Sequence, residues 1–339
     1  KWLADGGLAI INYDLLSRRA CLKGLKGHCL LLDESSLIQN PTAKRTKMIL
    51  SMHPEQAILL SGTPTGGKYE TLWTQLNLLG WHISKTAYWD RYIDFRIWDK
   101  MGFPLKIVTG YKNVPELKAS LYQHNARFLK SSEVYDDLPS QTFRTLEIPQ
   151  TKEYRLMLKD GISILDGKEI VGDTNLTYRL ALRELATVGK AALLDDILSS
   201  TAERVIVFYN FNRELLDALK VVDKDHISIM NGSQHDLTAY ENFEDSITFV
   251  QYQSGAMGLN LQLSRIMVFL SPPESSELYE QAKKRIHRIG QKKPCLYYNL
   301  IMSGSIECRI YEALAERKNY TDLLFRKDYG SRKTVRDKD

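Results

Sequence analysis

Short apolar runs of strand length recur along this chain and alternate with segments of helical pattern. Strands of a parallel sheet that is covered on both faces are continuous aliphatic runs, because neither side of the strand meets water. Such runs occupy residues 8–11, 29–32 and 57–60 in the first part of the chain, and residues 205–208, 227–230, 247–250, 266–270 and 296–301 in the second part. The pattern predicts an α/β fold with two parallel sheets, each covered by helices.

A segment of different composition, about residues 84–187, separates the two sets of runs. Its aromatic residues favour a small core of their own, because aromatic side chains bury much apolar area. Stacking on nucleic-acid bases is the alternative. These residues are Trp89, Tyr92, Phe95, Trp98, Phe103 and Tyr111. Residues 106–113 predict a small hairpin, and the pattern beyond residue 150 predicts helices.

These patterns divide the chain into four predicted regions. Residues 1–140 form an incomplete first lobe, of which about 84–140 are insertion, and residues 141–187 form a helical linker. Residues 188–325 form the second lobe. Residues 326–339 form a basic tail, which we expect to be solvated, with a supplementary phosphate contact as the alternative.

Composition is that of an ordinary globular protein, with 339 residues, 43% hydrophobic and 26% charged. No apolar stretch is long enough to span a bilayer, so no membrane partner is expected. The four cysteines lack metal-ligand spacing and predict reduced, mostly buried thiols in an intracellular protein, in cytoplasm, nucleoid or a host cell. The net charge of +5, concentrated around residues 283–293 and at the C-terminus, permits nucleic-acid binding.

The apolar run at residues 29–32 ends in two carboxylates, Asp33 and Glu34. An α/β fold places its ligand chemistry at the carboxyl ends of its parallel strands. Asp33 is suited to holding Mg²⁺ through water, and Glu34 to orienting or deprotonating an attacking water. An acidic turn after a strand is the simpler interpretation of this pair taken alone.

Two arginines stand three residues apart in the segment QAKKRIHRIGQ, residues 281–291. On a predicted helix Arg285 and Arg288 would be neighbours on one face, and Gly290 would end the helix. The stripe that would bury this helix is Tyr279, Ala282, Ile286 and Ile289. Two fixed guanidiniums suit the γ-phosphate of a nucleotide held on another domain, and a solvated basic helix is the alternative.

Together these two segments resemble the superfamily 2 helicases, in particular the Swi/Snf-type DNA translocases. The motifs follow in the family's order from residue 8 to about residue 325, and several motifs in order are more specific than any one. They are INYDLL (11–16), the acid box HCLLLDESS (28–36), LLSGTP (59–64, motif III), VFYNF (207–211, motif IV), SGAMGLNLQLS (254–264, motif V) and QAKKRIHRIGQ (281–291, motif VI). The ending RIGQ is characteristic of the Swi/Snf branch.

The resemblance implies two RecA-like lobes that hydrolyse ATP with Mg²⁺ in the cleft between them. Asp33 and Glu34 would serve the metal and the water, and Arg285 and Arg288 would reach across as arginine fingers. Three further residues would line or close the same cleft, namely Gly258 and Asn260 of motif V and Gln291 of motif VI.

The resemblance also implies binding to duplex DNA through phosphates, without sequence specificity and without necessary strand separation. Ser61 and Thr63 of motif III would couple the nucleotide state to DNA. The remaining expected DNA contacts are Asn210 of motif IV, Ser254 of motif V and Lys283 of motif VI.

The chain departs from the family pattern in two places. Residues 269–281 lack the family's Asp and Trp-Asn-Pro turn, and no phosphate loop GxxxxGK[ST] precedes Asp33. Residues 62–68, GTPTGGK, have the loop's spacing, but they follow the acid box and lead into Tyr69 where Ser or Thr is required. We therefore expect a longer N-terminus or a partner polypeptide to complete the first lobe, and the chain alone to bind ATP weakly and not hydrolyse it.

Two other functions stay open. The missing phosphate loop favours a catalytically silent, DNA-binding remnant, which nucleotide affinity would distinguish from an active enzyme. An interaction module on a helicase scaffold would bind no DNA, and the acid pair and the basic cluster argue against it. Salt-dependent DNA binding would separate this module from the other two.

Overall fold

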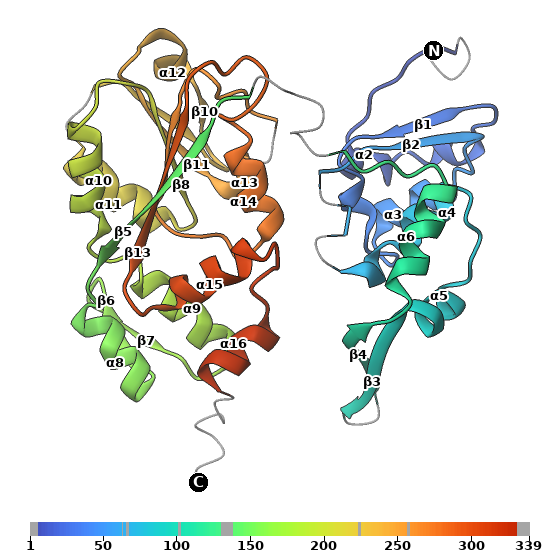
Figure 1. The fold of residues 1–339 in the computed structure, drawn as a ribbon, viewed down its shortest axis with the longest axis horizontal. Coiled ribbons are helices and arrows are strands. Elements are labelled where there is room, and N and C mark those ends of the chain that lie inside the picture. Colours follow the sequence, from blue (N-terminus) through green and yellow to red (C-terminus); the bar gives the residue numbers. More distant parts are fainter. Residues whose placement is uncertain are drawn as a thin grey trace. The chain divides into compact units, whose positions relative to one another are not determined.

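The computed structural model describes residues 6–62, 64–65, 68–100, 103–129, 138–222, 225–255 and 258–330. The chain divides into two compact units, residues 1–129 and 130–339, each with hydrophobic clusters of its own (Figure 1). Both units contain parallel strands joined by helical connections. The predicted α/β fold class with parallel sheets is therefore confirmed.

The first unit contains a two-stranded parallel sheet of β1 (Cys29–Leu32) and β2 (Gln56–Leu59). Its helical elements are α2 (Tyr13–Leu16), η1 (Ala20–Gly24), η2 (Ser35–Ile38), α3 (Lys44–Leu50), η3 (Tyr69–Thr71), α4 (Trp73–Leu78), α5 (Lys85–Tyr92) and α6 (Val114–Gln123). One face of this sheet packs Leu32 against Met48 and Ile49 of α3. On the other face, Leu31 and Ile58 are 60% and 49% exposed, so the expectation that helices cover both faces was wrong for the described residues.

The apolar run at residues 8–11 is not a strand, so that prediction was wrong. Leu8 and Ile10 are 89% and 93% exposed, and no strand among the described residues pairs with this segment. An apolar run becomes a strand only where a neighbouring strand satisfies its backbone groups. The sequence pattern alone does not include that neighbour.

The aromatic insertion folds into α5, α6 and an antiparallel hairpin of β3 (Ile93–Lys100) and β4 (Phe103–Tyr111). Tyr92 is buried, and Trp89, Phe95 and Tyr111 pack against the same cluster, so the predicted small core is confirmed for these residues. The cluster also includes Leu76 of α4 and Leu72, the residue directly before that helix. Trp98 does not take part and is 50% exposed.

The second unit is built on a seven-stranded sheet with the order β10-β9-β11-β8-β12-β13-β5, parallel except for β10. Its strands are β5 (Gln141–Ile148), β8 (Val205–Tyr209), β9 (Ile227–Met230), β10 (His235–Asp236), β11 (Ile247–Gln251), β12 (Ile266–Phe269) and β13 (Cys295–Met302). Its helices are α8 (Lys152–Asp160), α9 (Asn175–Leu185), α10 (Lys190–Ser199), α11 (Asn212–Val221), α12 (Thr238–Asn242), α13 (Tyr252–Gly255), α14 (Ser276–Lys283), α15 (Ile306–Ala315) and α16 (Asp322–Tyr329).

The central strand β8 explains why the sequence pattern worked in this unit. All five of its residues are buried. Val205 and Val207 face a cluster that includes α10 and α11, whereas Ile206 and Phe208 face a cluster that includes α9, α14 and α15. Because both faces are covered, the strand is a continuous apolar run. The five strands predicted in this part of the chain are confirmed, with ends that shift by at most one residue.

The predicted helical linker begins with a strand, so the helical prediction was wrong for residues 141–148. β5 pairs with β13 in parallel along its whole length, from Gln141 opposite Cys295 to Ile148 opposite Met302. The helices α8 and α9 follow, separated by a hairpin of β6 (Ile162–Leu165) and β7 (Lys168–Val171), so the helical prediction was also wrong for these two strands. The proposed domain boundaries otherwise stay a prediction.

The predicted basic tail also begins within a helix. α16 continues to Tyr329, and Phe325 is buried against Tyr178 at 5.8 Å between ring centroids. Burial of Phe325 holds this helix to the unit. Residues 326–328 on the same helix are exposed, so the expected solvation is confirmed for them although they are helical. Residues 331–339 lie outside the described part of the chain.

Candidate nucleotide and nucleic-acid site

The acid pair lies where β1 ends. Asp33 is exposed and Glu34 is half-buried, and the Glu34 backbone N–H donates to Asp33 Oδ1 at 3.0 Å. Glu34 has φ 51° and ψ 54°, the left-handed region that residues other than glycine seldom adopt. Such strained positions concentrate at functional sites. The acid pair thus forms a sharp turn directly after β1, and its catalytic role stays a prediction.

Tyr13 links the segment INYDLL to the acid box. Its hydroxyl donates to the carbonyl of Asp33 at 2.7 Å. Burial, followed by the nearby charges of Asp33 and Glu34, raises the pKa of Tyr13 to about 12. The phenol therefore stays protonated at neutral pH and keeps donating this bond.

A buried glutamine joins the acid box to motif III. The hydroxyl of Ser35, directly after Glu34, donates to Gln75 Oε1 at 3.2 Å, and Gln75 Nε2 donates to the carbonyl of Pro64 at 2.8 Å. Gln39 Nε2 donates to the same carbonyl at 2.9 Å. Ser35 and Gln75 are only 1% and 4% exposed, so the bond between them forms out of contact with solvent. Sequence analysis missed Gln75, because α4 carries no recognised motif.

Motif III also contacts the acid box through its backbone. Leu60 N–H donates to the carbonyl of Leu32, and the Leu60 carbonyl accepts from Ser35 N–H, both at 2.8 Å. The half-buried Ser61 is the residue after Leu60. Thr63 lies outside the described residues, and the coupling role of both residues stays a prediction.

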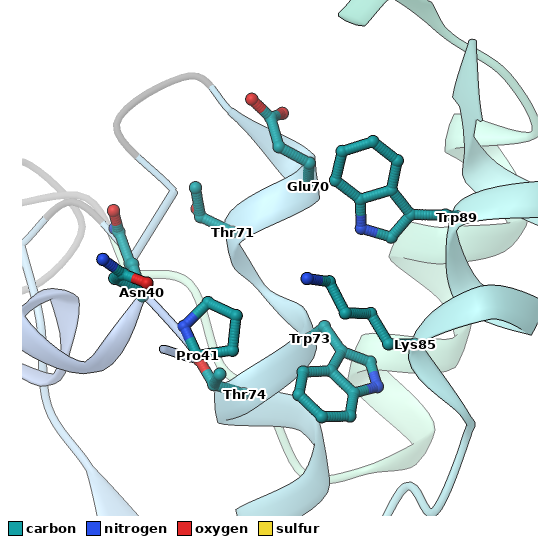
Figure 2. A pocket seen from close by; sticks show the side chains of 9 residues that line it. Asn40, Pro41, Glu70, Thr71, Trp73, Thr74, Lys85 and Trp89 are labelled. Atoms are coloured by element: carbon teal, nitrogen blue, oxygen red, sulfur yellow. The ribbon is translucent and has the colours of Figure 1, made fainter. Parts of the chain in front are cut away.

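A hollow of about 290 Å³ adjoins the same turn (Figure 2). Figure 2 shows the Lys85 side chain between the indoles of Trp73 and Trp89, with Asn40 and Pro41 on the other side. No predicted site residue lines this hollow. It still adjoins the acid box, because lining residue Thr74 donates to the carbonyl of Ile38 at 2.7 Å and thereby fixes the acid-box turn to α4.

In the second unit, the two arginines follow a helix instead of lying in it. α14 ends at Lys283, so the helical prediction was wrong for Arg285 and Arg288 and for the helix end at Gly290. Tyr279, Ala282 and Ile286 are buried as predicted. Ile289 is 63% exposed, so its assignment to the buried stripe was wrong. The stripe stops because the backbone no longer follows a helical period beyond α14.

The turn after α14 packs against motif V. Arg288 Nη1 donates a hydrogen bond to Asn260 Oδ1. One residue further, Leu261 N–H donates to the carbonyl of Arg285 at 3.2 Å. Gly258 has φ +72°, and no heavy atom of the described residues, its chain neighbours aside, lies within 4 Å of where its Cβ would be. The structure therefore brings Arg285, Arg288 and Asn260 together.

Gln291 holds the two motifs together. It is 8% exposed, and its Nε2 lies within hydrogen-bonding distance of the carbonyls of Gln262 (3.1 Å), Ser264 (2.8 Å) and Ile286 (3.3 Å). Its Oε1 accepts from Lys293 N–H at 3.0 Å. These contacts assign Gln291 a structural task between motifs V and VI. Its contribution to cleft closure stays a prediction.

The residues predicted to contact DNA in this unit have partners or cover within it. Asn210 Nδ2 donates to Ser271 Oγ at 2.8 Å and to the Pro272 carbonyl at 3.0 Å. Ser254 is 4% exposed. Lys283 pairs with Glu280 at 2.5 Å, and its ammonium lies 4.9 Å from the ring centroid of Tyr279. The DNA-binding roles of Asn210, Ser254 and Lys283 stay predictions.

The four cysteines differ in exposure. Cys295 is buried and Cys308 is half-buried, but Cys21 and Cys29 are exposed, so the expectation of mostly buried thiols was wrong for these two.

Among the described residues, no group of His, Cys, Asp or Glu is arranged as a metal cluster. The fit to Mg²⁺ therefore depends on Asp33, with its exposed carboxylate. Within the same part of the chain, no helix is both long and apolar enough to cross a bilayer.

Comparison with known families decides the identity of these motifs. The SNF2-related domain matches residues 1–190, and the helicase conserved C-terminal domain matches residues 189–290. The chain belongs to the SNF2-related family. This membership confirms the resemblance to the Swi/Snf branch of superfamily 2, which the motif order had suggested.

Relatives within the SNF2-related family are distant and much longer. Protein CHROMATIN REMODELING 4 of Arabidopsis thaliana is 24% identical, over 97% of this chain and 16% of its own length. The human SWI/SNF-related matrix-associated actin-dependent regulator of chromatin subfamily A member 1 is 24% identical, over 90% of this chain and 32% of its own length. The chain thus spans about a third or less of these relatives. The crystal structure of the C-terminal part of the Fun30 ATPase domain is 14% identical, with a TM-score of 0.44, over 57% of this chain and 97% of that one.

Proposed function

We propose that this chain is part of an ATP-dependent translocase on duplex DNA, which hydrolyses ATP with Mg²⁺ between two RecA-like lobes. The observation that carries the proposal is the joining of motif V to motif VI, in which Asn260 accepts a hydrogen bond from Arg288 beside Arg285. A phosphate-sensing pair of arginines needs such fixed geometry, because its catalytic effect depends on position.

Each unit would contribute one half of the reaction. Asp33 would hold Mg²⁺ through water, and Glu34 would orient or deprotonate the attacking water at the end of β1. Arg285 and Arg288 of the second unit would stabilise the charge that develops on the transferred phosphoryl group. When bound, Mg²⁺ would neutralise charge on the phosphate oxygens.

We further propose that another segment or a partner polypeptide supplies the phosphate loop. Its chemistry requires consecutive backbone N–H groups of a Gly-rich loop, a lysine and a helix N-terminus. The exposed face of the β1–β2 sheet, with Leu31 60% and Ile58 49% exposed, supports this, because parallel sheets are normally covered on both faces. On this proposal the 339-residue chain alone is inactive.

DNA binding is proposed to be independent of sequence and to occur inside the cell. The basic residues around motif VI support phosphate contacts, and no base-reading module is recognisable in the sequence. A catalytically silent DNA-binding protein is the second candidate, which nucleotide affinity would distinguish from an active enzyme. An interaction module without DNA binding is the third.

Two measurements on the same preparations test the proposal. The first is calorimetry of Mg·ATP with this chain and with the complete protein, followed by ATP hydrolysis with and without duplex DNA. We expect DNA-stimulated turnover only in the complete protein; its failure to hydrolyse ATP would favour the silent protein. The second is DNA affinity against salt, for which we expect a log–log slope of several units and discrimination among unrelated sequences below about 2 kcal/mol. A flat response would favour the interaction module.

A further inference from the structure

The β3–β4 hairpin exposes apolar side chains along its distal half. Ile97, Trp98 and Leu105 are 65%, 50% and 51% exposed. At the base of the hairpin, by contrast, Phe95 and Val108 pack against the core of the first unit. In Figure 1 the hairpin projects from the end of this unit that carries α5, away from β1 and β2. The apolar residues of its distal half therefore form a surface available to a partner.

The strand register assigns these side chains to two faces. Trp98 is opposite Leu105 and Arg96 is opposite Ile107, and alternate residues of a strand share a face. Arg96, Trp98 and Leu105 therefore lie together on one face. Ile97 is opposite Lys106, so the other face also carries one apolar and one cationic residue.

The cations of the distal half lack acidic partners. Arg96 and Lys106 are exposed, and neither forms an ion pair with any described residue. The Lys106 ammonium lies 4.1 Å from the ring centroid of Phe95, which orients it without neutralising it. At the base, Lys112 pairs with Asp94 at 3.6 Å. The uncompensated positive charge thus coincides with the exposed apolar residues, a combination that suits an anionic partner with apolar surface.

We infer that residues 96–98 and 105–107 of the β3–β4 hairpin form a contact surface for duplex DNA, an inference that rests on the proposed function. A two-stranded β-ribbon fits the major groove of B-form DNA. Arg96 would contact a phosphate on the face of Trp98 and Leu105, which would lie against the apolar parts of sugars and bases, and Lys106 would reach a phosphate from the opposite face. The contact supplies affinity without sequence reading, as a translocating protein requires.

The test measures affinity of the chain for a short fluorescent duplex by anisotropy, over a series of salt concentrations. We expect Arg96→Ala with Lys106→Ala to reduce the slope of log affinity against log salt by about 2, since each phosphate contact contributes about 1. We expect Trp98→Ala to weaken binding roughly five- to tenfold with little change in slope, because it removes apolar contact and no charge.

Matched controls come from the second unit, at the β6–β7 hairpin and at α8. Ile164 of β6 is 59% exposed and Lys152 of α8 is also exposed, so Ile164→Ser and Lys152→Ala test whether any exposed apolar or cationic residue has the same effect. Circular dichroism checks that each variant is folded. Wild-type-like slopes and affinities in the hairpin variants would overturn the inference while leaving the proposed function intact. Failure of the wild-type chain to bind any duplex would overturn both.

Discussion

Arg288 donates a hydrogen bond to Asn260, although the two residues are 28 positions apart and belong to different motifs. The bond holds the guanidinium to motif V two residues after Gly258, whose backbone is left-handed with φ +72°. Next to it, the Leu261 N–H donates to the Arg285 carbonyl. Motif V therefore fixes the position of motif VI within one unit, independently of how the two units meet.

Arg288→Ala should abolish most catalysis in the complete protein. If Arg288 acts as an arginine finger, DNA-stimulated kcat should fall roughly 10³-fold or more. Steady-state ATP hydrolysis at saturating duplex DNA measures this fall. The control is Arg309→Ala, which removes an exposed arginine of the same unit that pairs with Glu312 at 3.0 Å. Turnover close to wild type in the Arg288 variant would refute the assignment.

Asn260→Ala should lower kcat because Arg288 loses the acceptor that positions it. The effect should therefore not add to that of Arg288→Ala. The single variant loses the acceptor that positions the guanidinium, and we expect kcat to fall roughly tenfold, the scale of one lost hydrogen bond to a charged group. A double-mutant cycle compares both single variants with the double variant. Independent, fully multiplicative losses would show that Asn260 does not position Arg288.

Gln75→Met should destabilise the first unit. Methionine approximates the volume of glutamine but leaves the Ser35 hydroxyl without this partner and removes one of the two side-chain donors to the Pro64 carbonyl. We expect the free energy of unfolding to fall by about 1–3 kcal/mol, the usual effect of buried polar groups left unsatisfied. Denaturant titration measures the change, and hydrogen exchange should become faster at residues 33–38. The control is Gln123→Met on α6, where the side chain is exposed; equal losses in both variants would contradict the prediction.

Removing one member of the buried pair Lys190 and Glu307 should be worse than removing both. Lys190 Nζ lies 2.5 Å from Glu307 Oε1 and also donates to the carbonyls of Leu270 (2.6 Å) and Leu300 (2.7 Å). Both side chains are 2% exposed, so a single substitution leaves an uncompensated buried charge.

We expect Lys190→Met alone to lower the free energy of unfolding by about 3–5 kcal/mol, and Lys190→Met with Glu307→Leu to lower it less. Thermal and denaturant unfolding of the three proteins measures the difference. The exposed pair Lys318 and Glu316, 2.6 Å apart, offers the control, since its loss should change stability by less than about 1 kcal/mol. A double variant less stable than the single one would contradict the prediction.

The sequence by itself determined the strands of the second unit and the order of the motifs. The run at residues 205–208 predicted a strand because β8 is buried on both faces. Every residue of such a strand is apolar, so the sequence alone shows the pattern. Asp33 and Glu34 could be predicted for a similar reason. The two carboxylates directly follow an apolar run, so neighbouring residues in the sequence are enough to recognise them. Family membership then followed from several such segments in sequence.

Only the tertiary structure decided how these segments meet. Residues 141–148 form a strand because they pair with the edge of β13, whereas the apolar residues 8–11 have no such neighbour among the described residues. Arg285 and Arg288 lie beyond the end of α14, in a segment that Gln291 bonds to carbonyls of motif V. Gln75 joined the acid box to motif III without any motif of its own. In each case the residue that determines the local structure is distant in sequence, so a local sequence pattern cannot predict it.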